Sequence, residues 1–136
     1  MKKRLIISLF TLFLAACSAP TDKVVSLAEL QQTWQLVSID KQAVDKSITS
    51  TLNIAKNGKA TGNLACNNFF GTFELQEKTA KIVAMGSTRK ICLDLQNTVE
   101  QQVTTVFTDW SEVQLKDDSL TFIGQAHQLT YKLIAK

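Results

Sequence analysis

Short runs in which apolar and polar residues alternate occupy most of the chain after residue 33. Between residues 69 and 75, Phe69, Phe73 and Leu75 fall on one side of an extended backbone, and Phe70 and Thr72 fall on the other. Alternation with a period of two is typical of strands with one buried face. The pattern predicts seven or eight short strands, over residues 34–39, 49–54, 59–64, 69–75, 80–85, 112–116, 120–123 and 128–133.

Turn-forming residues separate these runs. Asn57-Gly58 lies between the runs 49–54 and 59–64, and this dipeptide tolerates positive φ, so it predicts a hairpin with a two-residue turn. Before the first strand, Ser26 and Glu29 have the spacing of a capping box, which predicts a short helix that ends near Gln32.

The apolar period changes once in the chain. Val99, Val103, Val106 and Trp110 recur at helical spacing, and Asn97 followed by Glu100 resembles a helix start, so one substantial helix is predicted near residues 96–107. We therefore expect a mainly β fold with a minor α part: a small antiparallel barrel or sandwich, with the inserted helix covering an open end.

The N-terminus has the layout of a secretory signal. Residues 2–4 are basic and residues 5–14 are apolar, a run too short to cross a bilayer, which takes about 20 residues. Leu14-Ala15-Ala16-Cys17 resembles the lipobox of bacterial lipoproteins. The sequence thus predicts a signal peptide over residues 1–16 and lipid on Cys17, whereas cleavage as an ordinary secreted protein would leave Cys17 as an odd thiol.

The predicted lipid places the protein at a membrane. Residues 17–26 are expected to act as the lipidated N-terminus and tether, and residues 27–136 as one domain. Ser18, rather than an aspartate, follows Cys17, and resemblance to the sorting of Gram-negative lipoproteins then favours the outer membrane, with the domain facing the periplasm.

Charge excludes one class of partner. The formal net charge is +3, but three of the 15 Lys and Arg residues lie in the signal, which leaves 12 cations against 12 Asp and Glu residues. A neutral domain lacks the basic surface that nucleic-acid binding requires, so no nucleic-acid partner is expected.

Two cysteines remain once Cys17 carries lipid. An even pair in an exported domain is most simply a disulfide, here between Cys66 and Cys92. Free thiols or a metal site are the alternatives, although His127 as the single histidine leaves such a site one ligand short of a closed zinc site. No metal and no cofactor are therefore predicted.

The run from Gly62 to Gly71 is the most informative stretch for binding. Its glycines and adjacent asparagines indicate a bulge or turn. The functional alternative is a recognition patch in which Asn67 and Asn68 join Arg89, and with it Lys90, through a Cys66 to Cys92 bridge.

Catalytic interpretations have little support in the sequence. His127 would have to serve as the base for any Ser or Cys nucleophile, and it lies in a predicted hairpin turn where an exposed histidine is the plainer interpretation. No catalytic residue is predicted.

Three segments together resemble the META domain family, which includes heat-inducible lipoproteins of the HslJ type. They are the run 62–71, the Thr88-Arg89-Lys90-Ile91-Cys92 segment, and the closing strand 127–133, with Glu100 in the helix as a further match. The resemblance implies a small barrel with one helix and a Cys66 to Cys92 bridge. It implies no established reaction, but an association with heat stress and with tolerance of novobiocin. Ala65 departs from the glycine that many of these domains have before the cysteine.

These observations favour a non-catalytic envelope lipoprotein that binds an unidentified envelope protein or component. Two alternatives remain open: a small-molecule carrier that uses the barrel interior, and a periplasmic inhibitor of a hydrolase. A carrier needs a cavity of about 300 Å³ or more, and bulky apolar residues suggest a filled interior instead. The residues concerned are Trp34, Phe69, Phe73, Phe107 and Trp110.

Overall fold

The computed structural model describes residues 23–134. The predicted signal peptide, Cys17 and most of the predicted tether lie outside the described residues. The helices are α1 (Leu27–Leu30) and α2 (Asp94–Thr108). The strands are β1 (Thr33–Ile39), β2 (Gln42–Ala43), β3 (Ser50–Ile54), β4 (Lys59–Leu64), β5 (Asn68–Gln76), β6 (Thr79–Ser87), β7 (Ser111–Lys116), β8 (Ser119–Ile123) and β9 (Gln128–Leu133).

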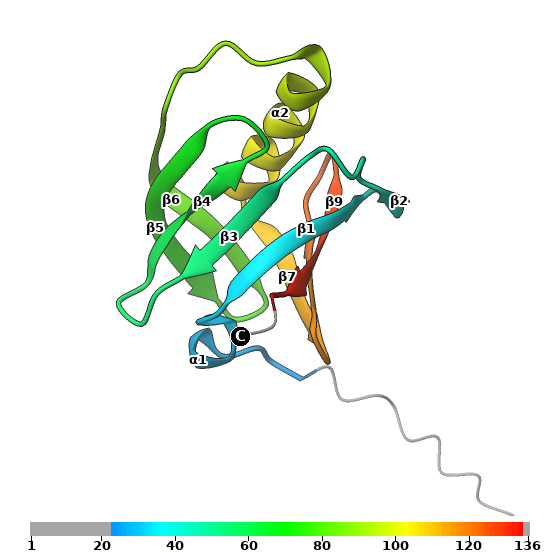
Figure 1. Cartoon of the computed structure of the whole chain (residues 1–136). Helices are drawn as coiled ribbons and strands as arrows, with labels where there is room; N and C mark the ends of the chain where they lie inside the picture. The colour runs from blue at the N-terminus through cyan, green and yellow to red at the C-terminus, as the bar shows by residue number, and fades with distance from the viewer. Residues whose placement is uncertain (1–22, 135–136) are drawn as a thin grey trace, which may run out of the picture.

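The strands form a closed antiparallel barrel (Figure 1). From β3 onwards each strand pairs with the next in the chain, β1 pairs with β3, and β9 pairs back onto β1. Two-residue β2 pairs only with β1 and stays outside the ring. Closure leaves no long unpaired edge. The predicted mainly β, barrel-like fold with an inserted helix is confirmed.

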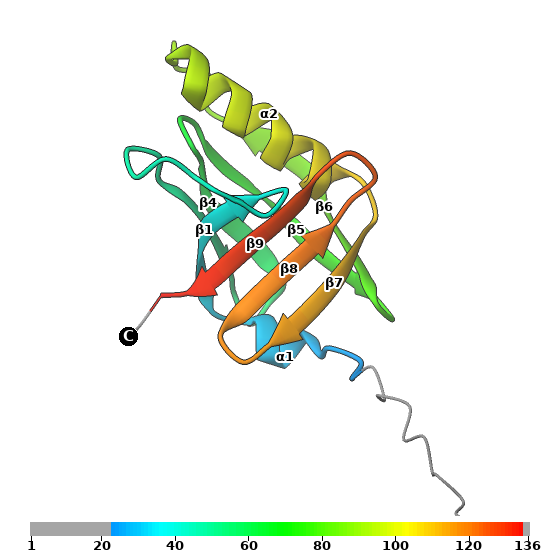
Figure 2. The same ribbon diagram turned by 90° about the vertical axis from the view of Figure 1, so that its right-hand side faces the viewer.

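Helix α2 packs across one end of the barrel (Figure 2), where it contacts β4, β6 and β9. Val99, Val103 and Val106 form its buried stripe, as predicted, together with Phe107. The prediction that Trp110 is the fourth member of this stripe is wrong, because the helix ends at Thr108 and Asp109 is extended.

The ring of Trp110 instead lies on the outside and is 37% exposed. The ammonium Nζ of Lys81 lies 4.7 Å from its centroid, a cation–π contact. The start predicted at Asn97 is also wrong: the helix begins at Asp94, and Gln96 Oε1 accepts the backbone N–H of Leu93 at 3.2 Å. Glu100 is therefore an interior position of the helix.

The hairpin between β3 and β4 is confirmed, but its turn differs from the prediction. Gly58 N donates to Ala55 O and Ala55 N donates to Lys59 O, both at 2.9 Å, so three residues form the loop. Only Gly58 has positive φ there, at +80°. The longer loop, with glycine in the last position, fits the twist of the paired strands as well as a two-residue turn does.

A two-residue turn with positive φ at both positions occurs instead between β1 and β2. Asp40 and Lys41 have φ of 50° and 66°, and Ile39 pairs directly with Gln42. Aspartate tolerates this conformation better than most residues, but the Asp-Lys pair is a weak signal. The sequence pattern therefore missed β2.

Aromatic side chains fill the interior of the barrel. The ring of Phe107, from α2, lies 5.6 Å from the rings of both Phe69 and Phe122 and 6.0 Å from that of Tyr131. Trp34 is also buried, and its Nε1 donates to Leu30 O at 3.0 Å. Burial raises the pKa of the Tyr131 hydroxyl well above its usual range. The centre of the fold is thus a packed core.

The first described residues already belong to this domain. Val25, within the segment expected to act as a tether, is buried, and Ser26 N donates to Glu29 Oε2 at 3.0 Å at the start of α1. The ammonium of Lys23 and the donors of Ser26 lower the pKa of Glu29 to about 2. Across residues 23–134, no helix has both the length and the apolar composition that a membrane span requires.

Candidate functional site

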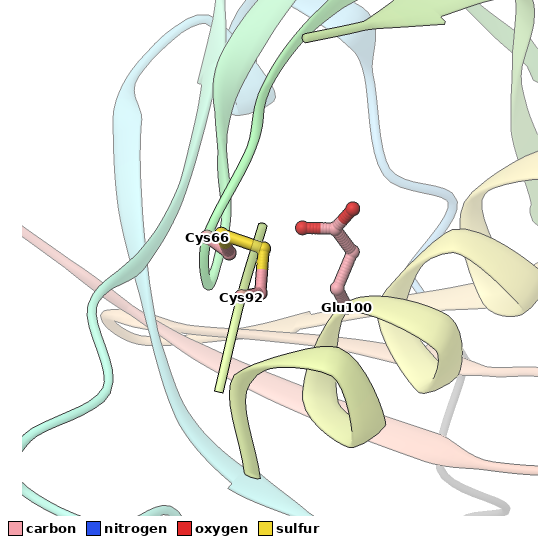
Figure 3. A group of neighbouring side chains, drawn as sticks. All are labelled: Cys66, Cys92 and Glu100. Atoms are coloured by element: carbon pink, nitrogen blue, oxygen red, sulfur yellow. A yellow bond between two sulfur atoms is a disulfide. The ribbon is translucent and has the colours of Figure 1, made fainter. Parts of the chain in front are cut away.

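The candidate site lies at the α2 end of the barrel, where the connection from β6 to α2 meets the connection from β4 to β5. We call the first of these, residues 88–93, the 88–93 loop. Cys92 of this loop forms a disulfide with Cys66, with the two Cα atoms 6.0 Å apart (Figure 3). The bridge joins segments that are 26 residues apart in the chain.

Asn67 is the centre of a hydrogen-bond network beside this disulfide. Its backbone N and side-chain Nδ2 donate to Oε2 and Oε1 of Glu100, each at 2.9 Å. Its Oδ1 accepts from Thr88 Oγ1 at 2.9 Å and from Lys90 N at 2.7 Å. We call these four residues the Asn67 network. It ties the β4–β5 connection, α2 and the 88–93 loop to one another.

The predicted recognition patch is divided between the inside and the outside of the molecule. Asn67 is only 5% exposed, and its polar groups are all used within the fold. Asn68 is exposed, and its Oδ1 accepts from Asn63 Nδ2. Its backbone O accepts from Thr88 N, and its backbone N donates to Thr88 Oγ1. The side chains of Arg89 and Lys90 are exposed. Asn67 thus orders the loop, and Arg89 is presented to solvent.

Two apolar side chains of the loop also face solvent. Ile91 is 103% exposed and Leu93 is 75% exposed, and the exposed side chain of Leu95 follows in α2. Ile91 and Leu93 flank Cys92, and such an alternation is equally typical of a buried strand, so their exposure could not be predicted from the sequence. Exposed aliphatic side chains next to one another mark an interaction surface more often than scattered ones do.

Cys66, Cys92 and Glu100 have ligand-type atoms within 4.8 Å of one another. Thiolates bind metals, but both sulfurs are here bonded to each other, and both oxygens of Glu100 accept hydrogen bonds from Asn67. His127, the ligand considered from the sequence, pairs with Asp40 instead. In the oxidised protein the cluster is therefore structural.

His127 Nδ1 lies 2.8 Å from Asp40 Oδ2, and Gln128 N donates to Asp40 Oδ1 at 2.8 Å. The backbone donor of Gln128 and then His127 lower the pKa of Asp40. The side chain of His127 is 28% exposed. No Ser, Thr or Cys side chain in residues 23–134 hydrogen-bonds to His127, so the pair fastens the β1–β2 turn to the start of β9 without forming a nucleophile–base arrangement.

A groove of about 300 Å³ runs between the N-terminal half of α2 and residues 39–48. Its walls are partly apolar, with Ile48 and Val99 at the base and Leu95 at the rim, and Asp40 and Asp45 line it as well. The groove lies outside the barrel core, so it does not provide the enclosed interior that a carrier would use.

Ala65, just before the disulfide, has φ of +121°, a conformation that L side chains rarely adopt. We expect Ala65→Gly to raise the free energy of unfolding by about 1 kcal/mol, because glycine adopts this conformation without strain. Urea denaturation measures the change.

The matched control for this substitution is Ala60→Gly, in strand β4, where the alanine is buried and its φ is not positive. Ala60→Gly is expected to lower the free energy of unfolding by about 1 kcal/mol. Equal losses in the two variants would show that the backbone at Ala65 carries no strain.

Comparison with known proteins gives one family match and several similar folds. The META domain model matches residues 26–135. Among curated proteins, none is similar enough in sequence to count as a relative.

Three solved structures resemble the barrel. A protein solved by NMR has a TM-score of 0.71 and 22% identity, over 80% of this chain and 95% of that one. An NMR structure from Burkholderia xenovorans has a TM-score of 0.65 and 19% identity, over 88% and 99%. The crystal structure of a DUF4847 family protein from Bacteroides vulgatus ATCC 8482 has a TM-score of 0.54 and 11% identity, over 79% and 95%.

At these identities the three structures establish a shared fold and nothing about function. The family model covers the whole barrel, including the Asn67 network and the disulfide, so the family can be stated from the sequence match itself. The chain belongs to the META domain family.

Proposed function

We propose that this protein is a non-catalytic binding module of the cell envelope, held at the outer membrane by lipid on Cys17 and facing the periplasm. The observation that carries the binding role is the display of Ile91 and Leu93 on a loop that the Cys66–Cys92 disulfide and the Asn67 network hold in place. Preorganised exposed side chains bind with a smaller entropy cost than those of a mobile loop.

The arrangement of the domain fits a tethered protein. The first described residues and α1 lie at one end of the barrel, whereas the 88–93 loop and α2 lie at the other end (Figures 1 and 2). A chain anchored through its N-terminus would therefore direct the loop away from its membrane and toward a partner in the periplasm. Incorporation of radioactive palmitate into the protein, and its absence from a Cys17→Ser variant, tests the anchor.

The competing functions receive less support from the site. A carrier would need space where the rings of Phe107, Phe122 and Tyr131 pack together. An enzyme would need a nucleophile, an activated water or a bound cofactor beside the pair of His127 and Asp40. As the family resemblance suggests, we further propose that binding by the loop contributes to envelope integrity during heat stress and to tolerance of novobiocin.

In-cell photo-crosslinking tests the binding role. A photo-reactive amino acid placed at Leu93 is expected to yield one adduct of defined mass, because this side chain is at the proposed interface. The same residue placed at Lys56 serves as the control, since Lys56 is exposed in the β3–β4 turn beside α1, at the other end of the barrel. Absence of an adduct at Leu93, or equal adducts at both positions, would overturn the proposal.

A further inference from the structure

We propose that the 88–93 loop is a substrate-like inhibitory loop for a serine endopeptidase whose specificity pocket is acidic, with Arg89 as the side chain that enters the pocket. The inference rests on the proposed binding function and names the class of partner. It uses the loop itself, the network beneath it and the charge of Arg89.

The two neighbours of Arg89 are fixed to the same atom. Thr88 Oγ1 and Lys90 N both donate to Asn67 Oδ1, at 2.9 and 2.7 Å. Asn67 thus supports the segment from below on both sides of Arg89, whose own side chain is exposed. A peptidase needs this presentation, with one residue projecting from a supported main chain.

The backbone of the loop can be bound as a peptide substrate is bound. Residues 88–93 belong to no helix or strand, and none of them has positive φ. Leu93 is extended, with φ of −69° and ψ of 155°. A segment outside the sheet can pair with a peptidase strand through the backbone groups that it does not use internally, and insert its side chains into successive pockets.

The charge at the tip selects an acidic pocket. Arg89 is the one arginine after the signal region of the sequence, and its guanidinium can pair with a carboxylate at the base of a specificity pocket, as in trypsin. The acids on the adjoining segment are Asp94, in the first turn of α2, and Glu100, whose oxygens accept from Asn67. Arg89 has no hydrogen-bond or ion-pair partner among the described residues.

The fold also provides the property that separates an inhibitor from a substrate. In the reaction, the enzyme's serine oxygen bonds to the carbonyl carbon of Arg89, the Arg89–Lys90 C–N bond breaks, and the serine proton passes through the enzyme's histidine to the Lys90 nitrogen. In an ordinary substrate the new amine departs, and water then hydrolyses the acyl-enzyme to release the Arg89 carboxylate. Here the Lys90 amine cannot leave, so before water reacts it attacks the carbonyl carbon of the acyl-enzyme. The ester bond to serine breaks, the amine proton returns through the enzyme's histidine to the serine oxygen, and the Arg89–Lys90 peptide bond re-forms.

Both sides of the scissile bond are held by contacts that do not depend on it. On the Arg89 side, Thr88 N donates to Asn68 O at 3.0 Å, and Ser87 pairs with Phe69. On the Lys90 side, the Lys90 N–H is bound by Asn67, and Cys92 is bonded to Cys66. Holding the amine beside the acyl-enzyme makes resynthesis an intramolecular reaction, which is strongly favoured over release.

The exposed apolar residues extend the same surface. Ile91 and Leu93 follow the scissile bond, and both face solvent. They would contact the leaving-group side of the peptidase, where apolar side chains add to an interface of the standard size for protease–inhibitor pairs. The bound peptidase would therefore cover Ile91 and Leu93 without any movement of the barrel.

Trypsin is the probe for this inference. The full chain, purified in mild detergent, is expected to inhibit trypsin at a molar ratio near one, with a dissociation constant of about 10 nM or lower. Mass spectrometry of the complex should find at most one cut, after Arg89, with the two parts still joined by the disulfide. Full trypsin activity, or rapid cleavage of the loop without inhibition, would overturn the inference.

Substitutions at Arg89 test its role. Arg89→Ala is expected to weaken trypsin inhibition by about 100-fold or more, because a buried arginine anchor is lost. Arg89→Leu should transfer inhibition to chymotrypsin, whose specificity pocket is apolar. Lys116→Ala is the matched control. It removes an exposed cation at the C-terminal end of β7, outside the 88–93 loop, and should leave inhibition unchanged.

The two proposals can fail separately. If trypsin retains its activity while the crosslink at Leu93 is still formed in cells, the inhibitory loop is wrong and the binding module stands. If Arg89→Ala and Lys116→Ala inhibit equally, the side chain of Arg89 is not the anchor, and the inference is overturned although the chain inhibits.

Discussion

Asn67→Ala is expected to lower the free energy of unfolding by about 3 kcal/mol, although the residue has the polar side chain of a surface position. The substitution leaves the backbone N of Lys90 and the hydroxyl of Thr88 without their acceptor, and it removes one of the two donors that bind Glu100. Groups that lose partners in a partly buried position keep their desolvation cost. Chemical denaturation monitored by tryptophan fluorescence measures the loss.

Asn68→Ala is the matched control, because Asn68 is the same residue type one position along and is exposed. Its side chain accepts one hydrogen bond from Asn63, so a change within about 0.5 kcal/mol is expected. Similar small effects in both variants would show that water replaces the contacts of Asn67. Hydrogen exchange at the Lys90 amide should speed up only in Asn67→Ala, since only that variant loses its acceptor.

The barrel was largely predictable from sequence because its strands have one buried face. In β5, for example, Phe69 and Phe73 point inward while Phe70 and Thr72 point outward, and the same alternation marks β9. A period of two depends only on local backbone geometry. Ring closure did not follow from that pattern, because the pairing of β1 with β9 joins strands at opposite ends of the chain.

The errors occurred where local patterns compete with distant contacts. Trp110 has the spacing of the α2 stripe, but the helix ends before it. Its ring instead makes a cation–π contact with Lys81 on β6. The spacing of Asn97 and Glu100 resembles a helix start. The carboxylate of Glu100 instead accepts two hydrogen bonds from Asn67, which is 33 residues away in sequence. A single sequence carries no signal for such a contact.

The candidate site was predicted only in part, because local sequence patterns do not reveal distant contacts. Adjacent asparagines and a neighbouring cysteine indicated an irregular backbone, and a bridge to Cys92 brought Arg89 into the same region. The pattern could not tell which asparagine turns inward. Asn67 is buried because its backbone N and Nδ2 both reach Glu100, whereas Asn68 begins a strand and faces out.

The Asn67 network and the disulfide support the loop in different ways. The network holds the side chain of Thr88 and the main chain of Lys90, on the two sides of Arg89, by hydrogen bonds that can break and re-form. The disulfide fixes Cys92 covalently, beyond the proposed scissile bond. Loss of the network should therefore loosen the tip, and loss of the disulfide should release the segment that follows it.

Replacing both cysteines, as Cys66→Ser with Cys92→Ser, is expected to lower the free energy of unfolding by about 3.5 kcal/mol. The bridge links residues 26 positions apart, and closing a loop of that length removes entropy from the unfolded chain. Urea denaturation of the double variant and of the reduced wild-type protein should give similar losses. A loss below about 1 kcal/mol in both would show that the unfolded chain keeps these segments together without the bridge.

The same double variant separates stability from the proposed inhibition. It keeps Arg89 and the Asn67 network, but the amine released at Lys90 is no longer held by a covalent bond through Cys92. At a temperature where the variant is still folded, trypsin should cut after Arg89 and regain activity as the ends separate, whereas the wild-type complex persists. Equal persistence of the two complexes would mean that hydrogen bonds alone retain the new ends, and that the disulfide acts only on the stability of the barrel.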